Sequence, residues 1–210
     1  MNFEEEQFIR ELDGIRERFF EMIQKCEAYE AAIEAPDRWA IPEVEVDDGS
    51  YHYIPYQLDG VVELLLELAK ILPDDPDFRH SHQPIRPLSL VEVGCGIGRN
   101  LNLFTHQQII PLTKAVGFDI VPEYVETAKT LYGLGEEVFV QDAMTFDYKG
   151  FDIIFFYRPF SDEKLEAEFE EYLLEHTKPG AIIIGLNVER LDSSRMVASV
   201  GRSGSCYKRL

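Results

Sequence analysis

From residue 88 onward, short apolar runs alternate with stretches of helical periodicity, and this alternation restricts the fold more than any other feature. The runs that predict strands are LSLVEVG (88–94), AVGFDI (115–120), EVFVQDA (137–143), FDIIFFY (151–157) and AIIIGLN (181–187). A strand that is apolar throughout is typical of a parallel sheet with both faces covered. The alternation therefore predicts an α/β fold, in which helices wrap a mostly parallel sheet.

The stretches between these runs predict the helices. They are RNLNLFTHQQII (99–110), PEYVETAKTLYG (122–133) and SDEKLEAEFEEYLLEHT (161–177). Near the C-terminus, RMVASV and SCYKRL flank GRSG, a pattern that predicts a closing hairpin of two short strands. A chain of 210 residues suffices for one such domain with a small extension.

Residues 1–87 have a different pattern, which predicts an N-terminal helical extension. Apolar residues recur with a period of about 3.5 over residues 4–34, which predicts one long helix. Its apolar stripe either docks on the rest of the chain or forms a coiled-coil seam of a homodimer, and its aromatic content favours docking. A second helix is predicted over 56–72, and a lid or linker around it. We therefore expect an extension at 1–87 and a Rossmann-like domain at 88–210.

The formal net charge of −19 narrows the classes of partner. An acidic protein repels phosphate backbones, so nucleic acid is not expected to bind. The three cysteines lie far apart, so neither a disulfide framework nor a metal site is expected. The acidic N-terminus is unlike a signal peptide, and no apolar run approaches the roughly 20 residues of a membrane span. These features predict a cytoplasmic protein without membrane contact.

The turn after the first predicted strand, VEVGCGIGRN (91–100), holds three glycines at a GxGxG spacing. Glycine loses much conformational entropy on folding, so its repetition at a strand end indicates that a ligand approaches the backbone closely. No glycine is followed by lysine, which excludes a phosphate-binding P-loop. The acids Glu92, Asp119 and Asp142 are expected near this turn, where they would repel a pyrophosphate and attract a cationic ligand.

Several motifs together resemble a known family. VEVGCGIG, FDI, QDA, FDIIFFYRPF and KPGAIIIG follow the order of motifs in class I S-adenosylmethionine-dependent methyltransferases, and the resemblance covers roughly residues 53–187. It implies a seven-stranded Rossmann-like sheet, mostly parallel, in the order 3-2-1-4-5-7-6. It also implies S-adenosyl-L-methionine as the cofactor, although no subfamily is identified.

The resemblance also implies a role for particular residues. The three glycines would line the methionine moiety, Asp119 would hold the ribose, and Asp142 with Ala143 would face the adenine. The cofactor-binding residues implied in this way are Tyr53, Glu92, Gly94, Cys95, Gly96, Gly98, Asp119, Ile120, Asp142 and Ala143.

The acceptor side is predicted from the end of the fourth strand. The segment YRPF (157–160) differs from the Asn/Asp-Pro-Pro-Tyr motif of amino-directed DNA methyltransferases, which disfavours a nucleobase acceptor. We expect Tyr157 to orient the acceptor through its hydroxyl and Arg158 to clamp a carboxylate or phosphate. The alternatives are an aromatic wall for Tyr157 and a surface salt bridge for Arg158.

These residues predict methyl transfer to a small molecule or a protein side chain. Two alternatives remain open. One is a cofactor-binding subunit or regulator without turnover, whose long N-terminal helix serves a partner. The other is a nicotinamide-dependent oxidoreductase, which the GxGxG spacing disfavours.

Overall fold

The computed structural model describes residues 14, 24, 49–79 and 85–210. The long helix predicted over residues 4–34 lies outside the described residues, apart from positions 14 and 24. The coiled-coil seam of a homodimer, which is one alternative for this helix, lies outside them as well. None of the described helices is long and apolar enough to cross a membrane.

The elements follow the predicted alternation along the chain. In order they are α2 (Leu58–Ile71), η1 (Leu72–Asp74), β1 (Leu88–Val93), α3 (Arg99–His106), β2 (Leu112–Asp119), α4 (Pro122–Tyr132), β3 (Val138–Val140), η2 (Tyr148–Gly150), β4 (Ile153–Tyr157), α5 (Glu163–His176), β5 (Ile182–Leu186), η3 (Leu191–Ser193), β6 (Val197–Val200) and β7 (Cys206–Arg209).

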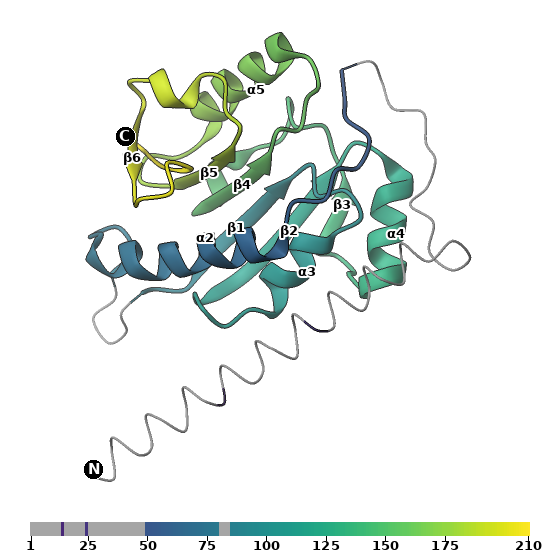
Figure 1. Ribbon diagram of the computed structural model, residues 1–210, viewed down its shortest axis with the longest axis horizontal. Coiled ribbons are helices and arrows are strands. Elements are labelled where there is room, and N and C mark those ends of the chain that lie inside the picture. Colours follow the sequence, from purple (N-terminus) through teal and green to yellow (C-terminus); the bar gives the residue numbers. More distant parts are fainter. Residues whose placement is uncertain (1–13, 15–23, 25–48, 80–84) are drawn as a thin grey trace.

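The strands form one seven-stranded sheet in the order β3-β2-β1-β4-β5-β7-β6, which confirms the order that the resemblance implied (Figure 1). The first five strands pair in parallel, and β1 lies between β2 and β4. The predicted hairpin of β6 and β7 is antiparallel, and β7 pairs with β5 against its direction. The carboxyl ends of β1, β2 and β4 therefore meet at one edge of the sheet.

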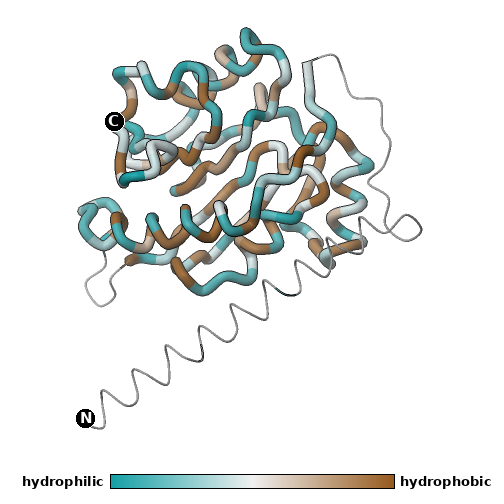
Figure 2. Tube along the Cα trace, in the orientation of Figure 1, coloured by the Kyte–Doolittle hydropathy of each residue, from teal (hydrophilic) through white to brown (hydrophobic). Residues whose placement is uncertain are grey.

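Helices cover both faces of the sheet and enclose its apolar side chains. On one face, Leu65 and Leu68 of α2 belong to the same buried cluster as Leu90 of β1 and Phe155 of β4. On the other face, Phe169 of α5 belongs to the second cluster. Figure 2 shows the apolar segments concentrated in the central strands and along α2. Although α2 shares the core of the sheet, the domain boundary between residues 87 and 88 stays a prediction.

Helix α3 ends at His106, four residues before the predicted end. The side-chain oxygen of Gln107 accepts the amides of Ile109 and Ile110 at 2.7 and 3.0 Å, and its amide nitrogen donates to the Ile110 carbonyl. The Gln107 side chain thus forms the hydrogen bonds of the backbone groups in a turn, and the helix ends there.

Strand β3 is also shorter than predicted, because it ends at Val140. Asp142 consequently lies in a turn beyond the strand, where its Oδ1 accepts the amide of Met144 at 2.8 Å. Such Asx turns compete with regular strand pairing.

Candidate functional site

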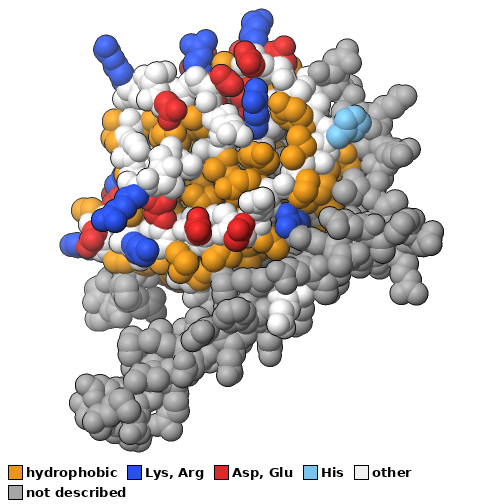
Figure 3. All heavy atoms as spheres, viewed as in Figure 1, with side chains coloured by type: hydrophobic (Ala, Val, Ile, Leu, Met, Phe, Trp, Pro, Cys, Tyr) orange, Lys and Arg blue, Asp and Glu red, His pale blue; other side chains and the backbone are white. Residues whose placement is uncertain are grey.

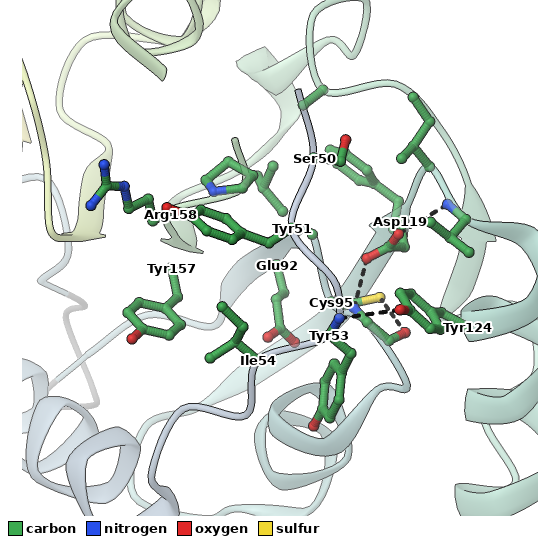
Figure 4. Close-up of a pocket in the computed structure, with 18 of the residues that line it drawn as sticks. Ser50, Tyr51, Tyr53, Ile54, Glu92, Cys95, Asp119, Tyr124, Tyr157 and Arg158 are labelled. Carbon is green, nitrogen blue, oxygen red and sulfur yellow. Dashed lines mark hydrogen bonds between the residues drawn. The ribbon is translucent and has the colours of Figure 1, made fainter. Parts of the chain in front are cut away.

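A cavity of about 230 Å³ lies at the carboxyl ends of the central strands, where open parallel sheets bind ligands. Its lining comes from β1, the glycine turn, the ends of β2 and β4, and residues 49–57, which we call the strap. Figure 4 shows Tyr157 and Arg158 at one end of the cavity, Asp119 and Tyr124 at the other, and Glu92 between them.

All three glycines of the turn after β1 have positive φ angles, and two of them also let other segments of the chain approach closely. Gly94 and Gly96 have φ angles of +66° and +52°, which side chains other than glycine rarely adopt. A Cβ atom on Gly96 would lie 2.3 Å from Cδ2 of Tyr53, and one on Gly94 would lie 3.4 Å from Cβ of Pro159. The absence of side chains here lets the strap and the end of β4 approach the turn.

The third glycine, which is predicted to line the methionine moiety, has a different position from the other two. Gly98, at the N-cap of α3, is not among the residues that line the cavity. A Cβ atom on it would lie 2.7 Å from Cδ1 of Leu134 and 2.8 Å from Cβ of Ala128. Glycine at position 98 is therefore favoured both by its φ angle of +79° and by the close packing of α3 against α4 and the turn after it.

Asp119 ends β2, as predicted, and its carboxyl joins two turns. Its Oδ2 accepts the amide of Gly96 at 2.8 Å, and its Oδ1 accepts the amide of Val121 at 2.9 Å. Burial raises the pKa of Asp119 above its ordinary value, and the backbone donors oppose that rise. Each carboxylate oxygen keeps a second lone pair, so Asp119 can still accept a hydrogen bond from a ligand.

Glu92 points from β1 into the middle of the cavity (Figure 4) and is only 2% exposed. Its Oε1 accepts the side-chain amide of Asn100 at 3.1 Å, whereas Oε2 is buried and has no hydrogen bond to any described residue. Burial raises the pKa of Glu92 to about 8, and the nearby charge of Asp119 adds to the rise. A buried oxygen without a partner suits a ligand that carries a donor or a positive charge.

The strap begins by pairing with the turn that follows β4. Ser50 and Phe160 form an isolated antiparallel bridge, and the amide of Ser161 donates to the carbonyl of Gly49 at 2.9 Å. In Figure 1 the strap is the dark blue segment that leads across this face into α2. The bridge therefore connects the strap to the segment that carries the predicted acceptor residues.

Farther along, two contacts hold the strap over the glycine turn. The amide of Tyr53 donates to the hydroxyl of Tyr124 on α4 at 3.1 Å, and the two rings meet edge to face at 6.2 Å. The Nη1 atom of Arg99 on α3 donates to the carbonyl of Tyr56 at 2.5 Å. The strap thus covers the cavity with contacts to two helices and a loop.

The other end of the cavity carries backbone strain. Arg158 directly follows β4 with a φ angle of +41°, and Asn187 directly follows β5 with a φ angle of +60°. Both residues line the cavity. Positive φ angles in residues other than glycine cost free energy, and they cluster at functional sites.

The structure brings nearly all of the predicted site residues together. All of them except Gly98 line the cavity. They are Tyr53, Glu92, Gly94, Cys95, Gly96, Asp119, Ile120, Asp142, Ala143, Tyr157 and Arg158. The sequence analysis missed Asn100, Tyr124 and Asn187. Asn100 could have been found from its place in the first turn after the glycines, but the other two are recognisable only from tertiary contacts.

Among the residues that the structure describes, no group of three His, Cys, Asp or Glu side chains could hold a metal ion.

Comparison with protein families gives one match. The family described as "Methyltransferase domain" matches residues 91–184, which run from β1 through the glycine turn to β5. The comparison with curated proteins finds no match.

Solved structures provide more distant similarities. An RNA methyltransferase from Salinibacter ruber, in complex with S-adenosyl-L-homocysteine, is 18% identical with a TM-score of 0.49, over 74% of this chain and 92% of that one. The N-methyltransferase NodS from Bradyrhizobium japonicum, in complex with the same ligand, is 16% identical with a TM-score of 0.45, over 77% and 71%. An amino pentose methyltransferase from Micromonospora echinaspora is 20% identical with a TM-score of 0.38, over 64% and 58%.

Proposed function

We propose that the chain is a class I S-adenosylmethionine-dependent methyltransferase that transfers the methyl group to a small molecule or a protein side chain. The observation that carries this proposal is the cavity at the carboxyl ends of β1, β2 and β4, where three carboxyl groups surround a glycine turn. The rest of the proposal concerns how the chain holds the cofactor and which acceptors suit the cavity.

The residues present fit the cofactor. S-adenosylmethionine supplies an electrophilic methyl group on a positively charged sulfur. The buried Oε2 of Glu92 lacks a partner, and a cationic ligand with an ammonium group would satisfy it. Gly94, Cys95 and Gly96 would lie along the methionine part, and the ring of Tyr53 would cover it.

The nucleoside would lie toward the ends of β2 and β3. In this proposal Asp119 accepts the ribose hydroxyls, Ile120 packs beside the nucleoside, and Asp142 with Ala143 faces the adenine. All four residues line the cavity, and they lie at or just after the ends of the neighbouring strands β2 and β3. Because Asp119 is held by two backbone amides, it would be oriented before the ligand arrives, which reduces the entropy lost on binding.

The chain contributes to methyl transfer mainly by orientation. In an in-line displacement the acceptor atom must approach the methyl carbon opposite the sulfur, and holding that geometry lowers the barrier by several kcal/mol. Tyr157 and Arg158 are the proposed acceptor-side residues, since they lie at the end of the cavity away from Asp119 (Figure 4). Burial raises the pKa of the Cys95 thiol well above its ordinary value, so Cys95 stays protonated and is a poor competing acceptor.

Charge supports the choice of acceptor class. A protein with a net charge of −19 repels nucleic acid, and a neutral or small acceptor avoids that long-range repulsion. We therefore place small molecules and protein side chains ahead of nucleic acid, and we expect nucleic-acid binding to vanish by about 150 mM salt.

The proposed function is tested by ligand choice and turnover. In isothermal calorimetry, S-adenosylmethionine and S-adenosylhomocysteine should bind, and both should raise the melting temperature, whereas NAD and ATP should do neither. Turnover is followed as release of S-adenosylhomocysteine with fractions of a cell extract as the source of acceptor. Tyr157→Phe should lower turnover and leave cofactor affinity nearly unchanged.

Three results would contradict parts of this proposal. Tight binding of NAD with no response to S-adenosylmethionine would favour the oxidoreductase. Cofactor binding without turnover in any fraction would favour a binding subunit or regulator. Retention of RNA or DNA at submicromolar affinity in high salt would show that the acceptor class is wrong.

A further inference from the structure

The two ends of the cavity have opposite charge. Asp119 and Asp142 line the part built by β2 and β3, beside Glu92 of β1, whose raised pKa of about 8 leaves its carboxyl mostly neutral at pH 7 until a cation binds there. Among the described residues that line the cavity, Arg158 is the only lysine or arginine, and it lies at the opposite end from Asp119 (Figure 4). Such a separation of charge favours a cation beside the carboxyls and an anion beside the guanidinium.

The guanidinium of Arg158 has few of its donors engaged. Its Nη2 lies 3.6 Å from Oε1 of Glu189, which is longer than the 2.7–2.9 Å typical of a charge-assisted hydrogen bond. Its Nε is buried without a hydrogen bond to any described residue. Because both side chains of the pair are about one third exposed, this ion pair contributes little.

Two carboxyls of α5 behind this end of the cavity make hydrogen bonds to backbone amides, and neither forms an ion pair with Arg158. Glu166 on α5 is fully buried, and its Oε2 accepts the amide of Phe160 at 3.0 Å. Burial, chiefly, raises the pKa of Glu166 to about 8, so it is mostly neutral at pH 7. Glu170 accepts three backbone amides, from residues 189 to 191, at 2.6–2.7 Å. Glu189 is therefore the main countercharge of Arg158.

The surfaces around Arg158 are aromatic and apolar. The guanidinium carbon lies 6.0 Å from the ring centroid of Tyr51, and the ring of Tyr157 contacts that of Tyr56 at 5.1 Å. Ile54, in the strap, also lines the cavity and is 50% exposed. Figure 3 shows apolar side chains gathered in the middle of this face above α2, with most charged side chains around the edge. A planar apolar group would bury this surface.

We propose that the methyl acceptor is a small aromatic molecule that carries a carboxylate, and that Arg158 binds this carboxylate in place of Glu189. This inference rests on the proposed function, because it assigns the end of the cavity that the cofactor leaves free. The planar guanidinium matches a carboxylate with two parallel hydrogen bonds, and the tyrosines contact the ring. The carboxylate serves as a handle, so the methylated atom lies elsewhere on the molecule.

The test compares three probes that share one ring and differ in charge: benzoate, benzyl alcohol and benzylamine. Each is titrated by calorimetry into the full chain saturated with S-adenosylhomocysteine. We expect benzoate to bind about tenfold more tightly than benzyl alcohol, since a hydrogen-bonded charge adds roughly that much, and benzylamine to bind most weakly. In Arg158→Gln the preference for benzoate should fall to within about twofold.

Two further variants complete the test. Arg202→Gln removes the same charge from an exposed turn between β6 and β7, and it should keep the full preference. Glu189→Gln removes the competing carboxylate, so it should tighten benzoate binding about threefold. This second variant keeps the inference testable if Arg158→Gln fails to fold.

The outcomes separate this inference from the proposed function. A wild-type protein that does not bind S-adenosylhomocysteine would overturn both. A protein that binds it but shows no preference for benzoate would overturn only the inference. Retention of the preference in Arg158→Gln, or weaker benzoate binding in Glu189→Gln, would overturn it too.

Discussion

The amide of Gly96 donates a 2.8 Å hydrogen bond to Oδ2 of Asp119, so the carboxyl at the end of β2 holds the glycine turn that follows β1. The other oxygen of Asp119 holds the amide of Val121 at the start of α4. One side chain therefore fixes the relative positions of two turns that line the cavity. Its loss should affect both the shape of the cavity and the contact proposed for the ribose.

We expect Asp119→Asn to weaken binding of S-adenosylhomocysteine by at least about tenfold. The amide keeps one acceptor oxygen but turns its NH₂ group toward the backbone amide of either Gly96 or Val121, and the charge-assisted bonds, each worth roughly 1.5–3 kcal/mol, are lost. Calorimetry measures the change. Asp147→Asn, at the N-cap of η2 and outside the cavity lining, is the control and should bind normally. Unchanged affinity in Asp119→Asn would show that the ribose lies elsewhere.

Gly96→Ala should lower cofactor affinity by more than about tenfold. The new Cβ would lie 2.3 Å from Cδ2 of Tyr53 at a φ angle of +52°, so the strap must move and the turn is strained. Tyr53→Ala in the same chain removes the steric conflict, leaving only the backbone strain. The double variant should therefore be more stable to heat than the sum of the two single changes predicts. Strict additivity of the two effects would contradict the contact.

Tyr124→Phe should loosen the strap without disturbing the core. The ring stays in place, but the amide of Tyr53 loses its acceptor, which costs about 1 kcal/mol. The backbone amides of residues 51–54 and 56 should then exchange hydrogen faster. In stopped-flow measurements, S-adenosylhomocysteine should dissociate several-fold faster. The control Tyr172→Phe removes a hydroxyl that donates to the Phe146 carbonyl, away from the cavity. Equal dissociation rates in all three proteins would mean that the strap does not limit release.

Glu166→Gln should change how stability depends on pH. The pKa of Glu166 is raised from 4.5 to about 8 in the folded state, so the folded protein holds a proton that the unfolded chain releases. Wild-type stability therefore falls as the pH rises from about 4.5 to 8, and glutamine removes this contribution. The variant should gain about 2–4 kcal/mol relative to wild type by pH 8, with no further gain at higher pH.

Denaturant unfolding at pH 4, 6 and 8.5 measures this difference. Glu168→Gln, on the exposed side of the same helix, is the matched control and should leave the pH dependence unchanged. A constant difference between Glu166→Gln and wild type at all three pH values would show that the pKa of Glu166 is the same in the folded protein as in the unfolded chain.

Local patterns in the chain were enough for the main features of the fold and for the glycine turn that lines the cavity. The apolar runs predicted the five parallel strands, and GxGxG with Asp119 marked the turn and the acid beside it. These predictions succeed because hydrophobic periodicity and the conformational freedom of glycine act over a few residues. Local signals also account for the early ends of α3 and β3, since the side chains of Gln107 and Asp142 form turns there that the periodicity does not show.

Tertiary structure alone decided which side chains meet around the cavity. Tyr53 and Tyr124 are 71 residues apart, and nothing local connects them. Gly98 has the same spacing as the other glycines but faces α4, and Glu166 has an ordinary place on a helix but lies fully buried behind Arg158. Burial and long-range pairing depend on how the whole sheet is covered, so the contacts of the strap and the charge of the acceptor end follow from packing and not from sequence pattern.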